Sequence, residues 1–188
     1  MTTLIDYKSP EKEILINVLK EYSIKAIPLL DSLNISSIIE NLIYEDVEEY
    51  YENGSLKSKY TLRFGKKEGL YQSWYENGQK EIECQYQDGK LEGLLQTWSE
   101  NGKKREECHH LNAKKEGLYQ YWWQNGQKLI DCQYRDGKLD GLFQCWFENG
   151  QKYIECHYLD DKKYGMYKEW HVEGNLLKER CYKDEEEV

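Results

Sequence analysis

The sequence predicts a mainly β fold: an elongated, single-layer antiparallel β-meander built from 24-residue hairpin repeats, with an N-terminal two-helix cap. Three observations predict it. Glycines and tryptophans recur every 24 residues, two kinds of turn sequence alternate, and all 14 glycines lie between residues 54 and 174. A short fixed period indicates an array in which each unit packs on its neighbours. The recurring positions are Gly54, Gly78, Gly102, Gly126, Gly150 and Gly174; Gly69, Gly93, Gly117, Gly141 and Gly165; and Trp74, Trp98, Trp122, Trp146 and Trp170.

The clearest unit is "GLYQSWYENGQKEIECQYQDGKLE", residues 69–92. Two segments of alternating character are separated by "ENG" and followed by "DGKLEG". Asn, Asp and Gly tolerate the positive φ that tight hairpin turns require. We therefore predict that each unit is a hairpin and that successive hairpins extend one meander over residues 48–182, as about five units and a fragment.

The repeated pattern G-x-x-x-x-W-Y-x-N-G-Q-K, followed by Y-x-x-G-K-x-x-G, resembles the MORN-repeat variant found in antitoxin-like proteins of bacteria and in proteins of large DNA viruses. The resemblance implies a binding role rather than an enzymatic one. Standard MORN units carry Y-x-G-x-W where this chain has Ile82, Cys84 and Tyr86. That departure weakens the transfer of the lipid-binding role sometimes ascribed to standard MORN proteins.

The register of the hairpin decides which side chains share a face, because a slip of one residue exchanges the faces. A two-residue Asn-Gly turn would place Trp74 opposite Glu81, and a three-residue loop with a glycine bulge would place Trp74 opposite Ile82. We favour the second, because it gathers the recurring side chains on one face, the predicted core. That face holds Leu70, Gln72, Trp74, Ile82, Cys84 and Tyr86, and positions 75 and 81 become cross-strand partners on the other, variable face.

Four cysteines occupy one position in successive units: Cys84, Cys108, Cys132 and Cys156. With two strands per unit, equivalent positions lie about 10 Å apart, twice the strand spacing. A disulfide requires Cα atoms within about 7 Å, and zinc requires sulfurs about 2.3 Å from one ion. We therefore predict buried thiols in a reducing compartment, with no metal and no cofactor.

The segment "ECHHLNAKKEG", residues 107–117, looks like a metal motif but aligns with "ECQYQDGKLEG" at 83–93. Cys108 and His110 should then share one face of a strand, and His109 should leave it. In this unit Glu106 replaces the equivalent of Ile82, and Ala113 replaces a turn glycine. The unit is therefore either the softest in the array or the most specialised.

Residues 9–45 lack glycine and show helical periodicity, which predicts two helices divided near Pro28. Residues 1–47 then form a segment that either caps the open sheet edge or recruits a partner, and residues 183–188 form an acidic tail. No cationic leader or apolar run of roughly 18 to 20 residues is present. We expect a soluble protein of the cytoplasm, that of the host cell if the source is a virus.

The formal net charge is −9, but residues 48–183 are almost neutral, because the acids concentrate near the ends of the chain. Nucleic acid and anionic lipid require a basic surface, so neither is an expected partner. No phosphate-binding glycine loop, nucleophile elbow or His-x-x-x-His pair occurs. We therefore expect a protein that is not an enzyme.

A protein–protein interaction scaffold is the favoured interpretation. Outward clusters of aromatic and aliphatic side chains often mark interaction surfaces, although the cluster predicted here could equally support the sheet. A recurring acidic row, Glu83, Glu107, Asp131, Glu155 and Glu179, supports one alternative, an antitoxin-like protein that sequesters a basic toxin. A protein that associates with membranes is a less favoured alternative. The predicted partner-binding residues are Tyr121, Trp123, Leu129, Phe147 and Tyr153.

Overall fold

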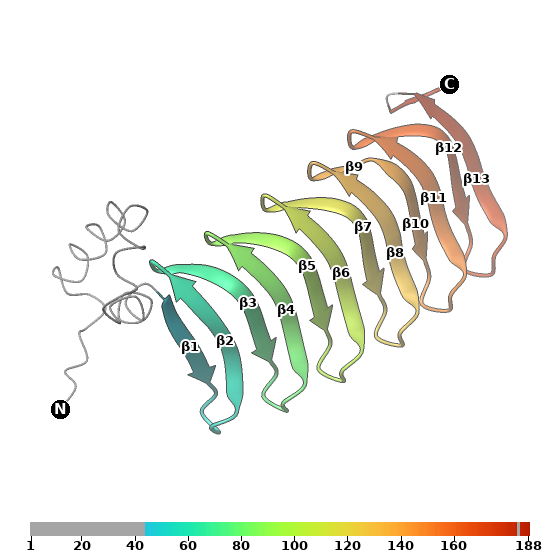
Figure 1. Cartoon of the computed structure of the whole chain (residues 1–188). Coiled ribbons are helices and arrows are strands. Elements are labelled where there is room, and N and C mark those ends of the chain that lie inside the picture. Colours follow the sequence, from blue (N-terminus) through green and yellow to red (C-terminus); the bar gives the residue numbers. More distant parts are fainter. Residues whose placement is uncertain (1–43, 184) are drawn as a thin grey trace, which may run out of the picture.

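The computed structural model describes residues 44–183 and 185–188, and within them the chain forms one open antiparallel sheet (Figure 1). The predicted two-helix cap lies outside the described residues, except that residues 44–47 belong to the first strand. The fourteen strands are β1 (Tyr44–Tyr50), β2 (Leu56–Arg63), β3 (Lys66–Trp74), β4 (Lys80–Gln87), β5 (Lys90–Trp98), β6 (Lys104–Leu111), β7 (Lys114–Trp122), β8 (Lys128–Arg135), β9 (Lys138–Leu139), β10 (Gly141–Trp146), β11 (Lys152–Leu159), β12 (Lys162–Trp170), β13 (Leu176–Lys183) and β14 (Glu186–Glu187).

Each strand pairs with the strands next to it in the sequence, as the predicted meander requires. β9 and β10 form a single strand position that is interrupted at Asp140. The last residues also join the sheet, because β14 pairs with the end of β13. The structure therefore confirms the predicted fold class for the described residues: a single-layer meander without a crossover.

The "ENG" turn is a three-residue loop closed by a glycine bulge, as predicted. In the β3–β4 hairpin, the N–H of Gly78 donates to the carbonyl oxygen of Tyr75 at 2.9 Å, and Gly78 has a φ of 82°. Asn77 accepts from the N–H of Gln79 and donates through Nδ2 to the carbonyl oxygen of Glu100 in the next turn, at 2.8 Å. The asparagine therefore both shapes its own turn and ties it to the following one.

The predicted register and core face are wrong. The three-residue loop places Trp74 opposite Lys80, and a bulge at residue 81 then places Ser73 opposite Ile82. Directly opposed residues of an antiparallel pair point to the same face. Ile82, Cys84 and Tyr86 therefore share a face with Tyr71 and Ser73, while the remaining predicted core residues, Leu70, Gln72 and Trp74, lie on the opposite face.

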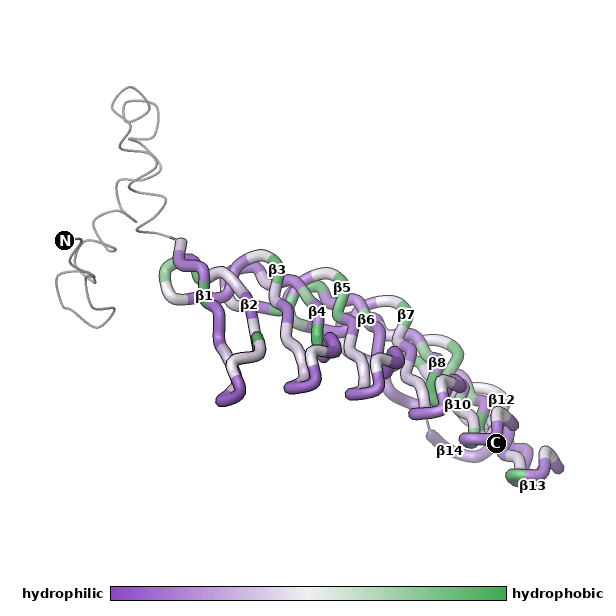
Figure 2. Tube along the Cα trace, turned by 90° about the horizontal axis from the view of Figure 1, so that it is seen from below, coloured by the Kyte–Doolittle hydropathy of each residue, from purple (hydrophilic) through white to green (hydrophobic). Residues whose placement is uncertain are grey.

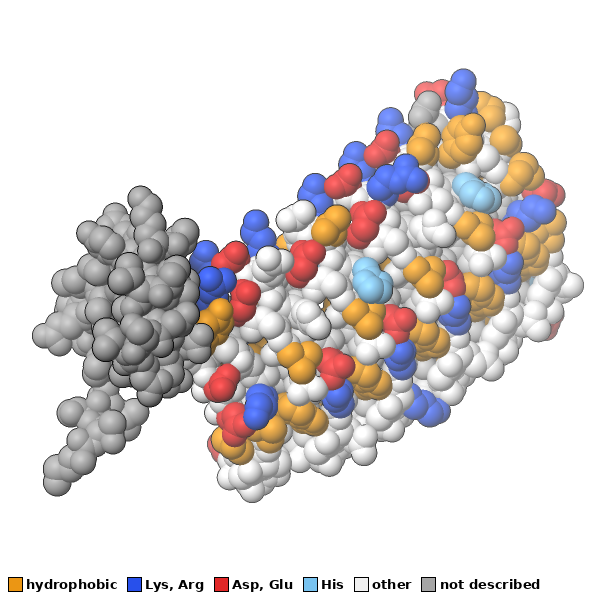
Figure 3. Space-filling model, in the orientation of Figure 1, with side chains coloured by type: hydrophobic (Ala, Val, Ile, Leu, Met, Phe, Trp, Pro, Cys, Tyr) orange, Lys and Arg blue, Asp and Glu red, His pale blue; other side chains and the backbone are white. Residues whose placement is uncertain are grey.

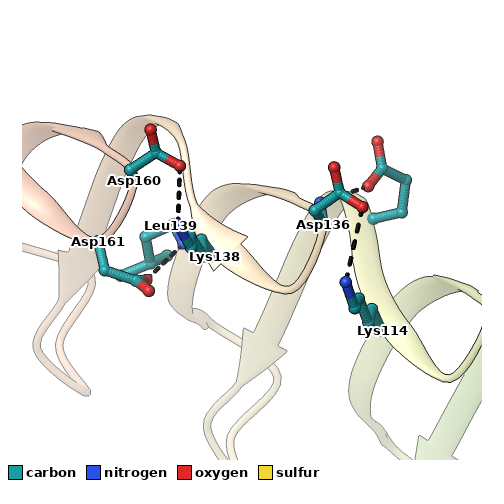
Figure 4. A network of polar contacts seen from close by, with 7 residues as sticks. Lys114, Asp136, Lys138, Leu139, Asp160 and Asp161 are labelled. Carbon is teal, nitrogen blue, oxygen red and sulfur yellow. Dashed lines mark hydrogen bonds and ion pairs between the residues drawn. The ribbon is translucent and has the colours of Figure 1, made fainter.

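The "DG" turns are two-residue loops in which both central residues have positive φ, as in Asp88 at 49° and Gly89 at 78°. The second turn residue also donates its N–H to the strand that follows the preceding turn: the N–H of Gly89 bonds the carbonyl oxygen of Lys67 in β3 at 2.9 Å. Figure 4 shows further links between these turns. Lys138 Nζ lies 3.2 Å from Asp160 Oδ1, and the N–H of Leu139 donates to Asp161 Oδ1 at 2.7 Å.

Ala113 stands where most equivalent turns have glycine, and its φ is 64°. A residue with a Cβ is disfavoured by about 1–2 kcal/mol in this conformation. We expect Ala113→Gly to raise the free energy of unfolding by about 1 kcal/mol, measured by urea denaturation. Asp161→Gly should give less, because the Asp161 carboxylate accepts the Leu139 N–H. No gain from Ala113→Gly would show that the turn conformation of Ala113 carries no cost.

All the hairpins bend in the same direction, so that the sheet forms a trough (Figure 1). The bends coincide with bulges. Between β4 and β5, Glu83 lies opposite Gln96 and Gln85 lies opposite Glu92, so three residues of β5 lie opposite Cys84 alone. Such bulges increase local curvature. Figure 2 shows that hydrophilic residues concentrate at the hairpin turns along the lower edge, and hydrophobic residues lie within the strands.

The face that carries the cysteines is the concave face. The ring centroids of Tyr71 and Tyr86 are 6.0 Å apart, and Lys67 Nζ lies 3.9 Å from the Tyr71 ring centroid. Residues four apart on a straight strand have Cα atoms about 13 Å apart, so this contact agrees with a strand that bends toward that face (Figure 1). Ser73 is buried beside them, whereas Leu70 on the convex face is 48% exposed.

Candidate partner-binding face

The convex face carries a polar network that recurs from hairpin to hairpin. Gln72 Nε2 donates to Glu83 at 2.7 Å, Lys80 Nζ pairs with the same carboxylate at 2.5 Å, and Lys80 lies over the Trp98 ring at 5.6 Å. The network repeats as Gln96–Glu107–Lys104–Trp122, Gln120–Asp131–Lys128–Trp146 and Gln144–Glu155–Lys152–Trp170. It therefore holds successive hairpins together and explains the period of the tryptophans.

This network changes the interpretation of the acidic row. The hydrogen bond from Lys80, followed by that from Gln72, lowers the pKa of Glu83, and the equivalent lysines and glutamines lower the pKa of Glu107 and Glu155. Glu179 pairs with Lys168 at 3.3 Å. Figure 3 views this face and shows rows of acidic, basic and hydrophobic side chains along the sheet. Each row carboxylate has a lysine partner, so the row is largely neutralised.

The cysteine row lines the bend of the concave face, where it is buried as predicted. Cys84, Cys108, Cys132 and Cys156 are 0–2% exposed. Burial raises the pKa of the Cys84 and Cys108 thiols to about 11 and that of Cys132 to about 12. These thiols are therefore protonated near neutral pH, and they serve as small packing groups where the bulge leaves little room.

The predicted placement of the two histidines is confirmed. His110 lies opposite Gly93 on the concave face, beside Cys108, while His109 lies opposite Leu94 on the convex face and is exposed. His110 Nδ1 is buried without a hydrogen-bond partner within the described part of the chain, and burial lowers the pKa of this imidazole. Among residues 44–183 and 185–188, no three His, Cys, Asp or Glu side chains converge closely enough to hold a metal ion.

The five predicted partner-binding residues form a patch on the concave face, not on a face opposite the cysteines as predicted. Tyr121 lies directly opposite Ile130, in the row that contains Ser73. The rings of Phe147 and Tyr153 pack with centroids 4.7 Å apart, and Tyr153 is 37% exposed. The register does not pair positions 75 and 81. Both nevertheless lie on the concave face, because residue 81 is the extra residue of the bulge. We call Tyr121, Trp123, Leu129, Phe147 and Tyr153 the aromatic patch.

Trp123 also has a structural role within this patch. Its indole Nε1 donates to the carbonyl oxygen of Trp146 at 3.0 Å. The hydroxyls of Tyr51 and Tyr75 make the same bond to the carbonyl oxygens of Trp74 and Trp98. Replacing Trp123 would therefore disturb the stacking of hairpins as well as the surface, so the other patch residues are better probes of binding.

A hollow of about 190 Å³ lies beside the aromatic patch and was not anticipated from the sequence. Its walls include Tyr75, Glu81, Thr97, Arg105, Glu106 and Tyr121. Arg105 Nε donates to the Tyr121 hydroxyl at 2.5 Å, and the guanidinium lies over the Tyr121 ring. A signal was present in the sequence. Arg105 stands where later hairpins have Leu129 and Tyr153, and Glu106 stands where the hairpins on either side have isoleucine.

The fold and its surfaces define a repeat protein of the open-trough type, in which equivalent hairpins present one concave and one convex face. The sequence model of the MORN repeat variant family matches residues 46–63, 67–88, 91–112, 115–136 and 139–160. These segments together cover more than half of the chain, which therefore belongs to the MORN repeat variant family. The matches end at residue 160, and the β12–β13 hairpin continues the same architecture.

No curated protein matches the chain significantly. MORN repeats are commonly interaction repeats that contact proteins or membranes. In the described residues, no helix is long and apolar enough to cross a membrane.

Proposed function

We propose that this chain is a non-enzymatic scaffold that binds a partner protein in the trough through the aromatic patch. The carrying observation is the clustering of four aromatic residues and a leucine on one stretch of the concave face, with the Phe147 and Tyr153 rings in contact. Tyrosine and tryptophan are enriched among residues that dominate binding energy, and a concave surface can surround such a contact and exclude water.

The convex face supports this assignment by contrast. Its glutamines, lysines and carboxylates are engaged with one another in every complete repeat, so the face is built to hold the array. The antitoxin-like alternative depends on the acidic row as a surface for a basic toxin. That role is less well supported, because lysine partners already neutralise the carboxylates. The raised pKa values of the buried thiols also leave those cysteines poor nucleophiles.

The test is affinity capture from the native cell with the wild-type chain and with Leu129→Ser/Tyr153→Ser, followed by binding measurements with the purified partner. We expect the double variant to weaken binding by at least about 30-fold, since each residue of a binding hot spot contributes about 2 kcal/mol or more. The control is Leu118→Ser on the convex face, where Leu118 is 46% exposed. A partner retained by the patch variant but lost by the control would place binding on the convex face.

A further inference from the structure

The β5–β6 hairpin departs from the repeat on its concave face while keeping its convex network. Arg105, Glu106 and His110 occupy positions that are Leu129, Ile130 and Tyr134 one repeat later. On the other face, Gln96 still donates to Glu107 at 2.7 Å, and Lys104 still pairs with Glu107 at 2.5 Å. His109 also departs from the repeat on the convex face, but the network that joins the hairpins is intact, so we interpret the concave changes as specialisation of the hollow.

The charges on the walls of the hollow are not matched to one another. Arg105 turns to the Tyr121 hydroxyl and makes no ion pair with a carboxylate of the described residues. Glu81 likewise lacks a cation within the described part of the chain, and its carboxylate accepts from Ser73 Oγ at 3.0 Å. Within the described residues Glu106 has one ion pair, with Lys115 at 3.9 Å, a distance that exceeds a hydrogen bond, and a hydrogen bond with Glu106 helps to raise the pKa of Tyr119. The walls therefore hold two half-buried carboxylates with acceptor capacity to spare.

We propose that the hollow receives a basic side chain, arginine or lysine, of the protein bound on the aromatic patch. Glu81 and Glu106 would accept its N–H groups, and hydrogen bonds between charged groups are the strong ones in such sites. The hollow has space for several water molecules, hence for a long side chain in place of water.

The geometry also sets the spacing of the partner's contacts. The aromatic patch spans the hairpins that follow the hollow, and each hairpin advances the trough by about 10 Å, twice the strand spacing. The partner segment therefore combines a basic residue with apolar residues roughly 10–20 Å farther along the trough. This inference rests on the proposed function, because it assigns a second contact to the same bound segment.

The experiment selects peptides from a displayed random 16-residue library on the full chain. Selections run in parallel on Glu81→Gln/Glu106→Gln, on Leu129→Ser/Tyr153→Ser, and on Glu45→Gln/Glu52→Gln. The last variant removes the same number of charges at exposed positions of the β1–β2 hairpin, outside the walls of the hollow. We expect wild-type peptides to combine apolar residues with arginine or lysine, and the Glu81/Glu106 variant to bind them at least about tenfold more weakly, the effect of losing one charged hydrogen bond.

The outcomes separate the two proposals. Selection of apolar peptides without basic residues, or of acidic peptides that depend on Arg105, would overturn the proposal that the hollow receives a basic side chain. The proposal that the patch binds a partner would stand. Failure of any peptide to depend on Leu129 and Tyr153 would overturn the proposed function itself. Concentration-dependent self-association that is lost in the patch variant would identify a second copy of the chain as the occupant and overturn both. Equal weakening by the Glu45/Glu52 control would reduce the effect to net charge.

Discussion

Replacing Cys132 with aspartate should lower the free energy of unfolding by about 3–5 kcal/mol, the cost of leaving an uncompensated charge in a buried site. Cys132 is 2% exposed and lies at the bend of the trough, where the strand opposite it carries the bulge. Neighbouring side chains cover this position, so the new carboxylate would lose most of its hydration. We expect the urea midpoint, followed by tryptophan fluorescence, to fall accordingly.

The repeat architecture also predicts the form of the transition. In an array where each unit contacts only its neighbours, a defect in the middle uncouples the two ends. The Cys132→Asp chain should therefore unfold in two steps where the wild type unfolds in one. Cys181→Asp is the matched control, because Cys181 is exposed on β13, and its effect should stay within about 0.5 kcal/mol. Similar losses at both sites would mean that the cysteine row is not the core of the trough.

The cysteine row and the meander were accessible from the sequence because they depend only on the period. Two strands per 24 residues fix the distance between equivalent positions, whatever the pairing of the strands. The turn sequences also predicted where the chain reverses and where φ is positive, as it is at Gly78, Asp88 and Gly89. These features follow from local chemistry that is repeated along the chain.

The assignment of faces failed because it depends on one residue that has no sequence signal. Residue 81 is an extra residue on β4. Without it Ile82 would lie opposite Gln72, on the face of Trp74, and the bulge places it opposite Ser73 instead. Bulges re-aim side chains without requiring a particular amino acid. The recurring side chains then divide between two faces for different reasons: Cys84 and Tyr86 fill the bend, while Gln72 and Trp74 build the network between hairpins.

The aromatic patch was predicted correctly as a group of residues, although the bulge places it on the other face. Its residues were chosen because they vary between units, and variation is expected wherever the repeat does not fix a side chain. The hollow was missed because Glu81 and Arg105 look like ordinary polar surface residues in the sequence, and it is the bulge that turns them into the trough. Only the three-dimensional arrangement places them beside Tyr121.

Restoring the repeat in the β5–β6 hairpin, by Glu106→Ile/His110→Tyr, should raise the free energy of unfolding by about 2 kcal/mol. The Glu106 side chain is only 22% exposed, and His110 Nδ1 is a buried nitrogen without a partner in the described structure. Burying one large apolar side chain contributes about 1.5–3 kcal/mol, and these two sites are half-buried. Leu95 stands where a tyrosine would complete the aromatic pair, so the gain remains below that of two full sites.

Hydrogen exchange measures this locally, because amides of β6 and β7 report the opening of that hairpin. In the wild type we expect them to exchange faster than amides of the adjacent hairpins, and in the double variant about 30-fold more slowly than before, the equivalent of 2 kcal/mol. His109→Gln restores the repeat at an exposed convex position, and it should change neither quantity. A double variant that is more stable yet loses its preference for basic peptides would show that Glu106 and His110 are kept for binding at a cost in stability. A variant with unchanged exchange would instead mean that the polar residues are as well accommodated as the apolar ones.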